Sequence, residues 1–82
     1  MAMLIPHYEL AHHIGCQQIE IDAATVDELL RIGSERYGEP FRRAGKTAAI
    51  VVNGRSISRL RGGKTPLGKH DTVWFILPAA GG

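Results

Sequence analysis

The residues most suited to take part in a reaction lie at the C-terminus, where the sequence ends in Gly81-Gly82. Glycine has no Cβ, so such a tail can enter a narrow channel and present its α-carboxylate to the active site of another protein. Terminal residues are also often disordered, and an inert end is the ordinary alternative. We expect Gly82 to carry a reacting group and Gly81 to give it clearance if the rest of the chain agrees.

The other side chains that could act in catalysis or metal binding form no convincing site. Cys16 is the only cysteine, and we expect it to be a small buried thiol rather than a nucleophile. The histidines lack an acid or cysteine at ligand spacing, so we expect them on the surface without a metal; they are His7, His12, His13 and His70. No phosphate-binding glycine loop or catalytic triad is recognisable.

The size and composition predict one soluble domain. The chain has 82 residues, which allow a modest core but no catalytic cleft between lobes, so a binding or carrier module is expected over residues 1–82. No apolar run approaches the roughly 20 residues that cross a bilayer, and no secretion signal is visible. A single cysteine suits a reducing compartment, and the cytoplasm is the expected location.

The charges are unevenly distributed although the net charge is only +2. Residues 1–40 hold seven acids against two arginines, whereas residues 41–70 hold eight bases and no acid. This second part could face an acidic partner or nucleic acid. The bases lie in loop-like sequence without interleaved aromatics or a recognition helix. We therefore expect a solvated face or an acidic protein partner and no nucleic acid.

The first half of the chain predicts a strand pair followed by one main helix. Strands are expected over residues 3–8, with Pro6 at an unpaired position, and over residues 17–22, where polar and apolar residues alternate. A turn or short helical stretch over residues 9–15 ends on Gly15 between them. Thr25 and Glu28 form a capping box that starts the helix, and Gly38 followed by Pro40 marks its end. Gly33 allows close approach along the helix.

The second half predicts a buried strand over residues 48–52, the turn Asn53-Gly54, a brief strand near Ile57 and a last strand over residues 72–77. These elements predict an α+β fold with a mixed sheet of four to five strands packed on one main helix. Val73, Phe75 and Leu77 are expected on the helix side.

Trp74 and Ile76 then fall on the opposite side of the sheet, where exposed apolar groups can mark a partner site. Val51 extends this site if it shares that face. The alternative is that Trp74 packs beneath a loop.

Several motifs together resemble the MoaD/ThiS family of sulfur carrier proteins, which are relatives of ubiquitin. The most specific is the closing segment, residues 71–82, with its Asp-x-Val, apolar strand, Pro78 and terminal Gly81-Gly82. Supporting matches are Thr25-Val26-x-x-Leu29-Leu30, Val52-Asn53-Gly54 and Arg59-x-x-Gly62-x-x-Thr65-Pro66-Leu67. The resemblance implies a ubiquitin-like β-grasp fold with a flexible tail over residues 79–82.

The resemblance also implies a mechanism in which the chain is a cosubstrate and not an enzyme. An E1-like adenylating enzyme of the MoeB/ThiF type activates Gly82 with ATP, which binds to that enzyme and not to this chain. Sulfur then replaces the adenylate, and the thiocarboxylate donates sulfur to an accepting synthase. Pro78 stiffens the exit of the tail from the sheet.

Two other functions use the same activated glycine. The chain could be a ubiquitin-like modifier that joins target lysines, or the small subunit of molybdopterin synthase. Within the family, Ile5-Pro6 and the segments 59–63 and 76–79 lean towards the carriers of cysteine biosynthesis. The internal Leu60-Arg61-Gly62-Gly63 matches the ending of ubiquitin, but cleavage there would remove the last strand, so we interpret it as a loop.

Overall fold

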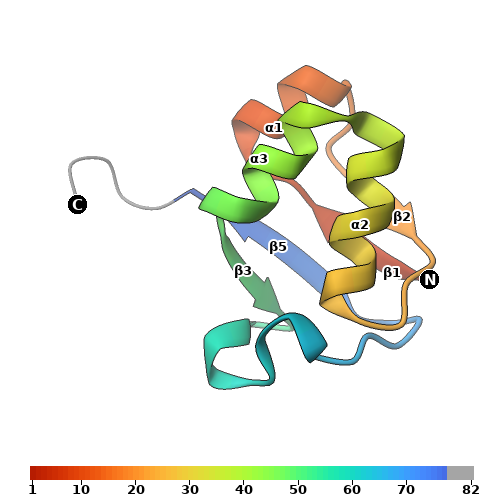
Figure 1. The fold of residues 1–82 in the computed structure, drawn as a ribbon, viewed down its shortest axis with the longest axis vertical. Coiled ribbons are helices and arrows are strands. Elements are labelled where there is room, and N and C mark those ends of the chain that lie inside the picture. Colours follow the sequence, from red (N-terminus) through yellow and green to blue (C-terminus); the bar gives the residue numbers. More distant parts are fainter. Residues whose placement is uncertain (78–82) are drawn as a thin grey trace.

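Five strands form one mixed sheet in the computed structural model of the protein, which describes residues 1–77 (Figure 1). The strands are β1 (Ala2–Ile5), β2 (Ile19–Ile21), β3 (Ala49–Val52), β4 (Arg55–Ser56) and β5 (Thr72–Ile76). Their order is β2-β1-β5-β3-β4, in which β1 and β5 run parallel and the other neighbours antiparallel. The predicted mixed sheet is confirmed.

The first two strands pair antiparallel, as predicted, but helix α1 (Tyr8–Ile14) lies within their connection. β1 stops at Ile5, earlier than predicted, and Pro6 follows it. Proline has no N–H to donate to a strand ladder, which explains this boundary. α1 ends at Gly15, whose φ of 74° suits a residue without a Cβ. The expected short helical stretch is therefore a defined helix.

Helix α2 (Val26–Tyr37) begins where the sequence predicts. The Glu28 backbone N–H donates to Thr25 Oγ1 at 3.2 Å, and Glu28 Oε1 accepts from the Ala24 N–H at 3.1 Å. The carboxylate thus reaches one residue further back than the predicted bond to the Thr25 N–H. Both contacts satisfy backbone donors at the start of the helix.

A third helix, α3 (Glu39–Thr47), shows that the prediction of one main helix was wrong. Gly38 ends α2 with a φ of 80°, and Pro40 falls in the first turn of α3. Proline suits a first turn because the N–H groups there have no acceptor within the helix. The same Gly-x-Pro signal therefore ends one helix and starts the next, and Phe41 and Ala44 bury α3 against the core.

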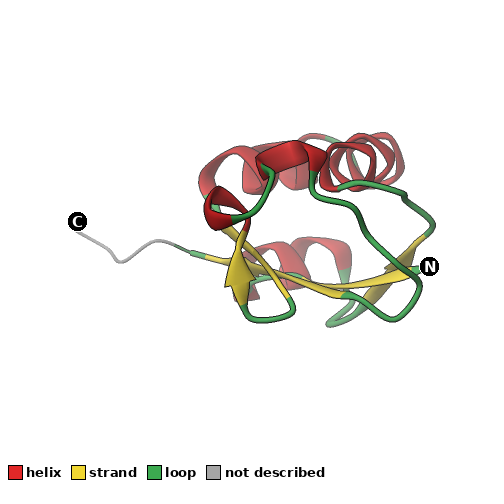
Figure 2. Ribbon diagram, turned by 90° about the horizontal axis from the view of Figure 1, so that it is seen from below, coloured by secondary structure: helices red, strands yellow, loops and turns green. Residues whose placement is uncertain are grey.

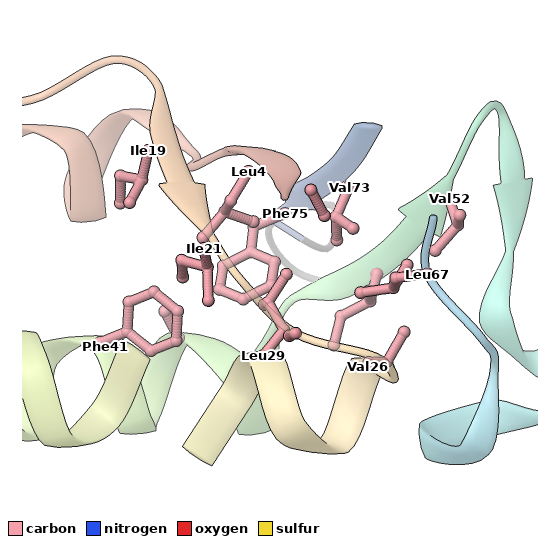
Figure 3. Close-up of a cluster of buried hydrophobic side chains, with 14 of the residues drawn as sticks. Leu4, Ile19, Ile21, Val26, Leu29, Phe41, Val52, Leu67, Val73 and Phe75 are labelled. Carbon is pink, nitrogen blue, oxygen red and sulfur yellow. The ribbon is translucent and has the colours of Figure 1, made fainter. Parts of the chain in front are cut away.

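Helices α2 and α3 cover one face of the sheet, and the core lies between these two layers (Figure 2). Figure 3 shows the apolar side chains that meet there from both layers. The largest fully buried ones are Leu4, Leu10, Ile21, Val26, Leu29, Phe41 and Val73. The rings of Phe41 and Phe75 lie 5.5 Å apart between centroids and connect α3 to β5. The sheet face away from α2 and α3 is left without this cover.

Replacing Gly33 by alanine is expected to destabilise the fold. A Cβ at Gly33 would lie 2.1 Å from Cζ of the buried Phe41 ring, so the ring or α3 must move. Overpacking of this kind costs about 1–3 kcal/mol, which exceeds the gain of up to roughly 1 kcal/mol from alanine's helix propensity. Denaturant unfolding of the wild type and the variant measures the difference.

Gly45→Ala is the matched control, because its Cβ would meet Leu30 Cδ2 at 3.0 Å, at the end of a flexible side chain. It should change the free energy of unfolding little. A Gly33→Ala variant as stable as Gly45→Ala would show that the packing of Phe41 on Gly33 is not tight.

Candidate functional site

The C-terminal segment leaves from the middle of the sheet. β5 lies between β1 and β3, and Leu77 directly follows its last residue, Ile76. A central strand is hydrogen-bonded on both sides, so the start of this segment has a fixed place relative to the sheet. The predicted site residues Pro78, Gly81 and Gly82 and the predicted tail over residues 79–82 lie outside the described residues.

Side chains on β5 alternate between the core and solvent. Val73 and Phe75 are buried as predicted, whereas Trp74 is 45% and Ile76 47% exposed. Leu77 also lies on the helix side as predicted, but it follows the last residue of β5 and is 41% exposed. Leu77 lines a groove of about 480 Å³ that also includes residues of α1 and α3.

Trp74 and Ile76 belong to a larger apolar surface, which we call the open face. Trp74 is directly opposite Ile5 on one side and Val51 on the other, so Val51 shares its face. Ile76 is opposite Ala49 in the same register. The open face consists of Met3, Ile5, Ala49, Val51, Trp74 and Ile76, from three adjacent strands.

The open face suits contact with another protein. None of its six side chains is charged, and neither α2 nor α3 covers it. Contiguous exposed apolar groups are uncommon on monomers and often mark interfaces, because burying them releases water. The surface ends beside Leu77, so a partner that binds there would stand next to the origin of the C-terminal segment.

Met3, Ile5 and Ala49 are members of the open face that the sequence did not predict. Residues 2–5 are all apolar, so their types do not show that Ala2 and Leu4 face the core while Met3 and Ile5 face outwards. Their place beside Trp74 depends on the parallel pairing of β1 with β5, which joins opposite ends of the chain. No local pattern specifies such a pairing.

A hydrogen-bond network fixes the start of β5. The Asn53 side-chain amide donates to Asp71 Oδ1 at 2.8 Å, and Asn53 Oδ1 accepts from the Thr72 N–H at 3.0 Å. Asp71 Oδ2 accepts from the Gly68 N–H at 2.7 Å. The hydrogen bonds to Asp71 lower the pKa of its carboxyl below the ordinary value of 3.8. The bond from the Gly68 N–H has the largest effect, and the bond from Asn53 has the next largest. Asn53 therefore does more than form the predicted turn.

The stabilisation from Asp71 is expected to depend on pH. A carboxyl with a lowered pKa in the folded state stabilises the fold above its unfolded pKa and loses this effect as pH falls through its folded pKa. Asp71→Asn should therefore be less stable than the wild type at pH 7, and the gap should narrow below about pH 3.8. Thermal unfolding at pH 7 and pH 3 tests this; a gap of constant size would contradict it.

The cysteine and the histidines do not form a common site among residues 1–77. Cys16 is exposed in the connection after α1, so the prediction of a buried thiol was wrong. His12, His13 and His70 are exposed as predicted, but His7 is half-buried and its Nδ1 accepts from the Leu10 N–H at 3.2 Å. It caps α1. Within residues 1–77, no three His, Cys, Asp or Glu side chains are grouped so as to hold a metal ion.

The internal Leu60-Arg61-Gly62-Gly63 segment is part of a hydrogen-bonded loop. Buried Thr65 donates its hydroxyl to the Gly62 carbonyl at 2.7 Å and accepts from the Arg61 N–H at 3.1 Å. The Thr65 carbonyl in turn accepts from the Val26 N–H at 3.1 Å. The loop thus supports the first turn of α2, in agreement with its interpretation as a structural loop.

Across residues 1–77, no helix has both the length and the apolar character to span a membrane.

The chain matches one protein family and is similar to several solved structures. A model of the ThiS family matches residues 8–82. The chain is similar to structures of the Amycolatopsis orientalis BexX/CysO complex (20% identity, TM-score 0.86, all of both chains) and of small archaeal modifier protein 1 (SAMP1) from Methanosarcina acetivorans (19%, 0.83, 99% of this chain and 95% of that one). It also resembles the Haloferax volcanii HVO 2177 protein (26%, 0.75, 99% and 85%).

No curated protein sequence matches the chain. The structural likenesses confirm the predicted ubiquitin-like β-grasp.

Proposed function

Because the chain belongs to the ThiS family of small ubiquitin-like proteins, which are not catalysts, we propose that it is a sulfur carrier. In this proposal Gly82 alternates between a carboxylate and a thiocarboxylate. The observation that supports it best is the family match, which runs to residue 82 and so includes both terminal glycines. The chain is a cosubstrate, and the catalytic residues belong to its partners.

The chemistry requires activation in trans. A carboxylate is a poor electrophile, so one Gly82 oxygen attacks the α-phosphorus of ATP and pyrophosphate leaves. A sulfur nucleophile then attacks the carbonyl carbon of the acyl-adenylate, and AMP leaves with that oxygen. We assign the first step to an E1-like adenylating enzyme of the MoeB/ThiF type and the use of the sulfur to an accepting synthase.

The open face and the tail have separate roles in this proposal. Trp74, Ile76 and Val51 bind the activating enzyme through apolar contact, which supplies affinity without chemistry. The five residues 78–82 can span at most about 18 Å when extended, so the enzyme's reaction centre must lie close to the edge of the open face. The position of Leu77 beside that face supports this arrangement.

The accepting pathway is proposed to be cysteine or cofactor biosynthesis. Similarity to the CysO chain of the BexX/CysO complex supports a carrier that works with partner proteins. Similarity to a small archaeal modifier protein supports the second candidate, a modifier that joins Gly82 to target lysines through an isopeptide bond. Both functions begin with the same adenylation and differ in the nucleophile that follows.

Intact-protein mass spectrometry tests the proposal. The full chain is incubated with ATP, a sulfide source and an activating enzyme that is competent on another carrier. Replacement of one oxygen by sulfur at Gly82 would support the carrier; ATP-dependent lysine conjugates without sulfur exchange would favour the modifier. A chain of unchanged mass would contradict both candidates.

A further inference from the structure

The bases of residues 41–70 have no part in the proposed sulfur chemistry, and two of them, Arg55 and Arg61, meet at one cleft. The cleft has a volume of about 730 Å³ and lies where β3, β4 and the loop before β5 converge. Its lining includes Val52, Arg55, Leu60, Arg61 and Pro66. We call this feature the basic cleft.

The basic cleft combines an apolar floor with unpaired cations. Val52 is buried beneath it, and Leu60 is 36% exposed, although leucine prefers the core. Arg55 and Arg61 are exposed, and neither forms an ion pair with any carboxylate in the described part of the chain. Leucine beside two free guanidinium groups suits an acidic segment that also presents an apolar side chain.

The single acid at the basic cleft is occupied elsewhere. Both carboxylate oxygens of Asp71 accept hydrogen bonds, one from Asn53 and one from Gly68. Asp71 therefore holds the loop in place and makes no ion pair with Arg55 or Arg61. The guanidinium groups remain available to an acid from outside.

The backbone that presents these side chains is already ordered. The Leu60 N–H donates to the Ile57 carbonyl at 3.0 Å, and the Arg61 N–H donates to Thr65 Oγ1. Arg55 pairs with Val52 in the β3–β4 ladder. A binding partner would not have to order this loop, which lowers the entropic cost of association.

The basic cleft is separated from the tail. Val52 pairs with Val73 near the start of β5, whereas Leu77 follows the other end of the strand. With a rise of about 3.3 Å per residue, the two ends of β5 lie roughly 13 Å apart. In Figure 1 the loop that carries the cleft is at the bottom of the molecule, away from the end of β5.

We propose that the basic cleft is a second docking site, which binds an acidic segment of a partner protein with an apolar anchor residue. Aromatic side chains that could stack nucleic acid bases are absent from its lining among residues 1–77, which favours a protein over a nucleic acid. The site goes beyond the proposed sulfur chemistry and does not depend on Gly82.

Two-dimensional NMR of the full ¹⁵N-labelled chain at low salt tests this proposal without any activating enzyme. The probe is a blocked hexapeptide of aspartate and glutamate residues with one central leucine. Chemical shifts should change at Val52, Leu60, Arg61 and Thr65 and not on α3. Exchange of the peptide's leucine for serine, and a rise in salt, should each weaken binding, because both the anchor and the charges contribute.

Charge variants sharpen the test. Arg55→Glu with Arg61→Glu should weaken binding by about tenfold or more, and Arg55→Gln with Arg61→Gln by less. The matched control, Arg43→Glu with Lys46→Glu on α3, has the same net charge as the first variant and should bind almost as the wild type does. Equal losses in the two Glu variants, or shifts spread evenly over all bases, would overturn the proposal.

A thymidine oligonucleotide, added as a competitor of the peptide, tests whether the cleft binds nucleic acid instead. If it displaced the peptide and bound more tightly at the same residues, the cleft would be a nucleic-acid site, and the proposal would be overturned. The proposal would also be overturned if the peptide caused no chemical-shift change at roughly millimolar concentration. A dissociation constant of about 1 mM corresponds to only about 4 kcal/mol of binding free energy, so even weak binding would be detected.

Discussion

Deletion of Gly82 is expected to abolish thiocarboxylate formation and leave the free energy of unfolding unchanged. The variant still ends in a carboxylate, on Gly81, but that group falls one residue short of the activating centre. Misplacement of a reacting atom by even 1 Å can slow a reaction about a hundredfold, and one residue of extended chain spans more than 3 Å. Intact-protein mass spectrometry measures the sulfur exchange, and thermal unfolding measures the stability.

Ala80→Gly is the control for this deletion, because it keeps the length of the tail and its terminal carboxylate. It should accept sulfur as the wild type does. Sulfur on Gly81 of the shortened chain at the wild-type rate would show that the position of the carboxylate is not critical. A large drop in melting temperature after the deletion would show that the tail contributes to the fold.

Replacement of Trp74 by alanine is expected to weaken binding to the activating enzyme by roughly thirtyfold or more. Buried tryptophans at interfaces commonly contribute about 2 kcal/mol or more to affinity. Trp74 lies in the centre of the open face, between Ile5 and Val51, and is 45% exposed in the free protein. Its loss should lower the free energy of unfolding by less than it lowers the binding free energy. Calorimetric titration and denaturant unfolding compare the two.

Tyr8→Ala is the matched control, because Tyr8 is an aromatic residue of α1 with 83% exposure and lies outside the open face. It should leave binding almost unchanged. If Trp74→Ala cost as much in folding as in binding, Trp74 would be acting as a core residue. Equal binding losses in the two variants would contradict a role for the open face.

Local signals in the sequence predicted much of the fold. The Thr25 cap placed the start of α2, and the alternation in β5 placed Trp74 and Ile76 away from the core. The family resemblance, drawn from motifs spread over the chain, is confirmed by the match to the ThiS family. The cap and the strand alternation were predicted correctly because each depends on residues a few positions apart.

The errors arose where one local signal fits two structures. Gly38 and Pro40 end a helix, but the same residues also begin one, and the burial of Phe41 on Gly33 decides between them. Cys16 is exposed because it lies in the connection between α1 and β2, not within an element. Burial there is a tertiary property that residue type alone does not determine.

The site was predicted only in part for the same reason. Trp74, Ile76 and Val51 could be named from strand patterns, and the structure places them side by side. Ile5 joins them only through pairing between the first and last strands. The arginines of the basic cleft were visible as a run of charge, but the cleft itself forms by convergence of separate segments.

The central position of β5 has a consequence for synthesis on the ribosome. Until residues 72–76 emerge, β1 and β3 have no strand between them, and the sheet remains two separate halves. Nascent chains that stall before this point lack Val73 and Phe75 from their core and cannot complete the native packing. Folding of the complete sheet therefore waits for β5, so the element that supplies the partner-facing Trp74 is also the one that makes the domain native.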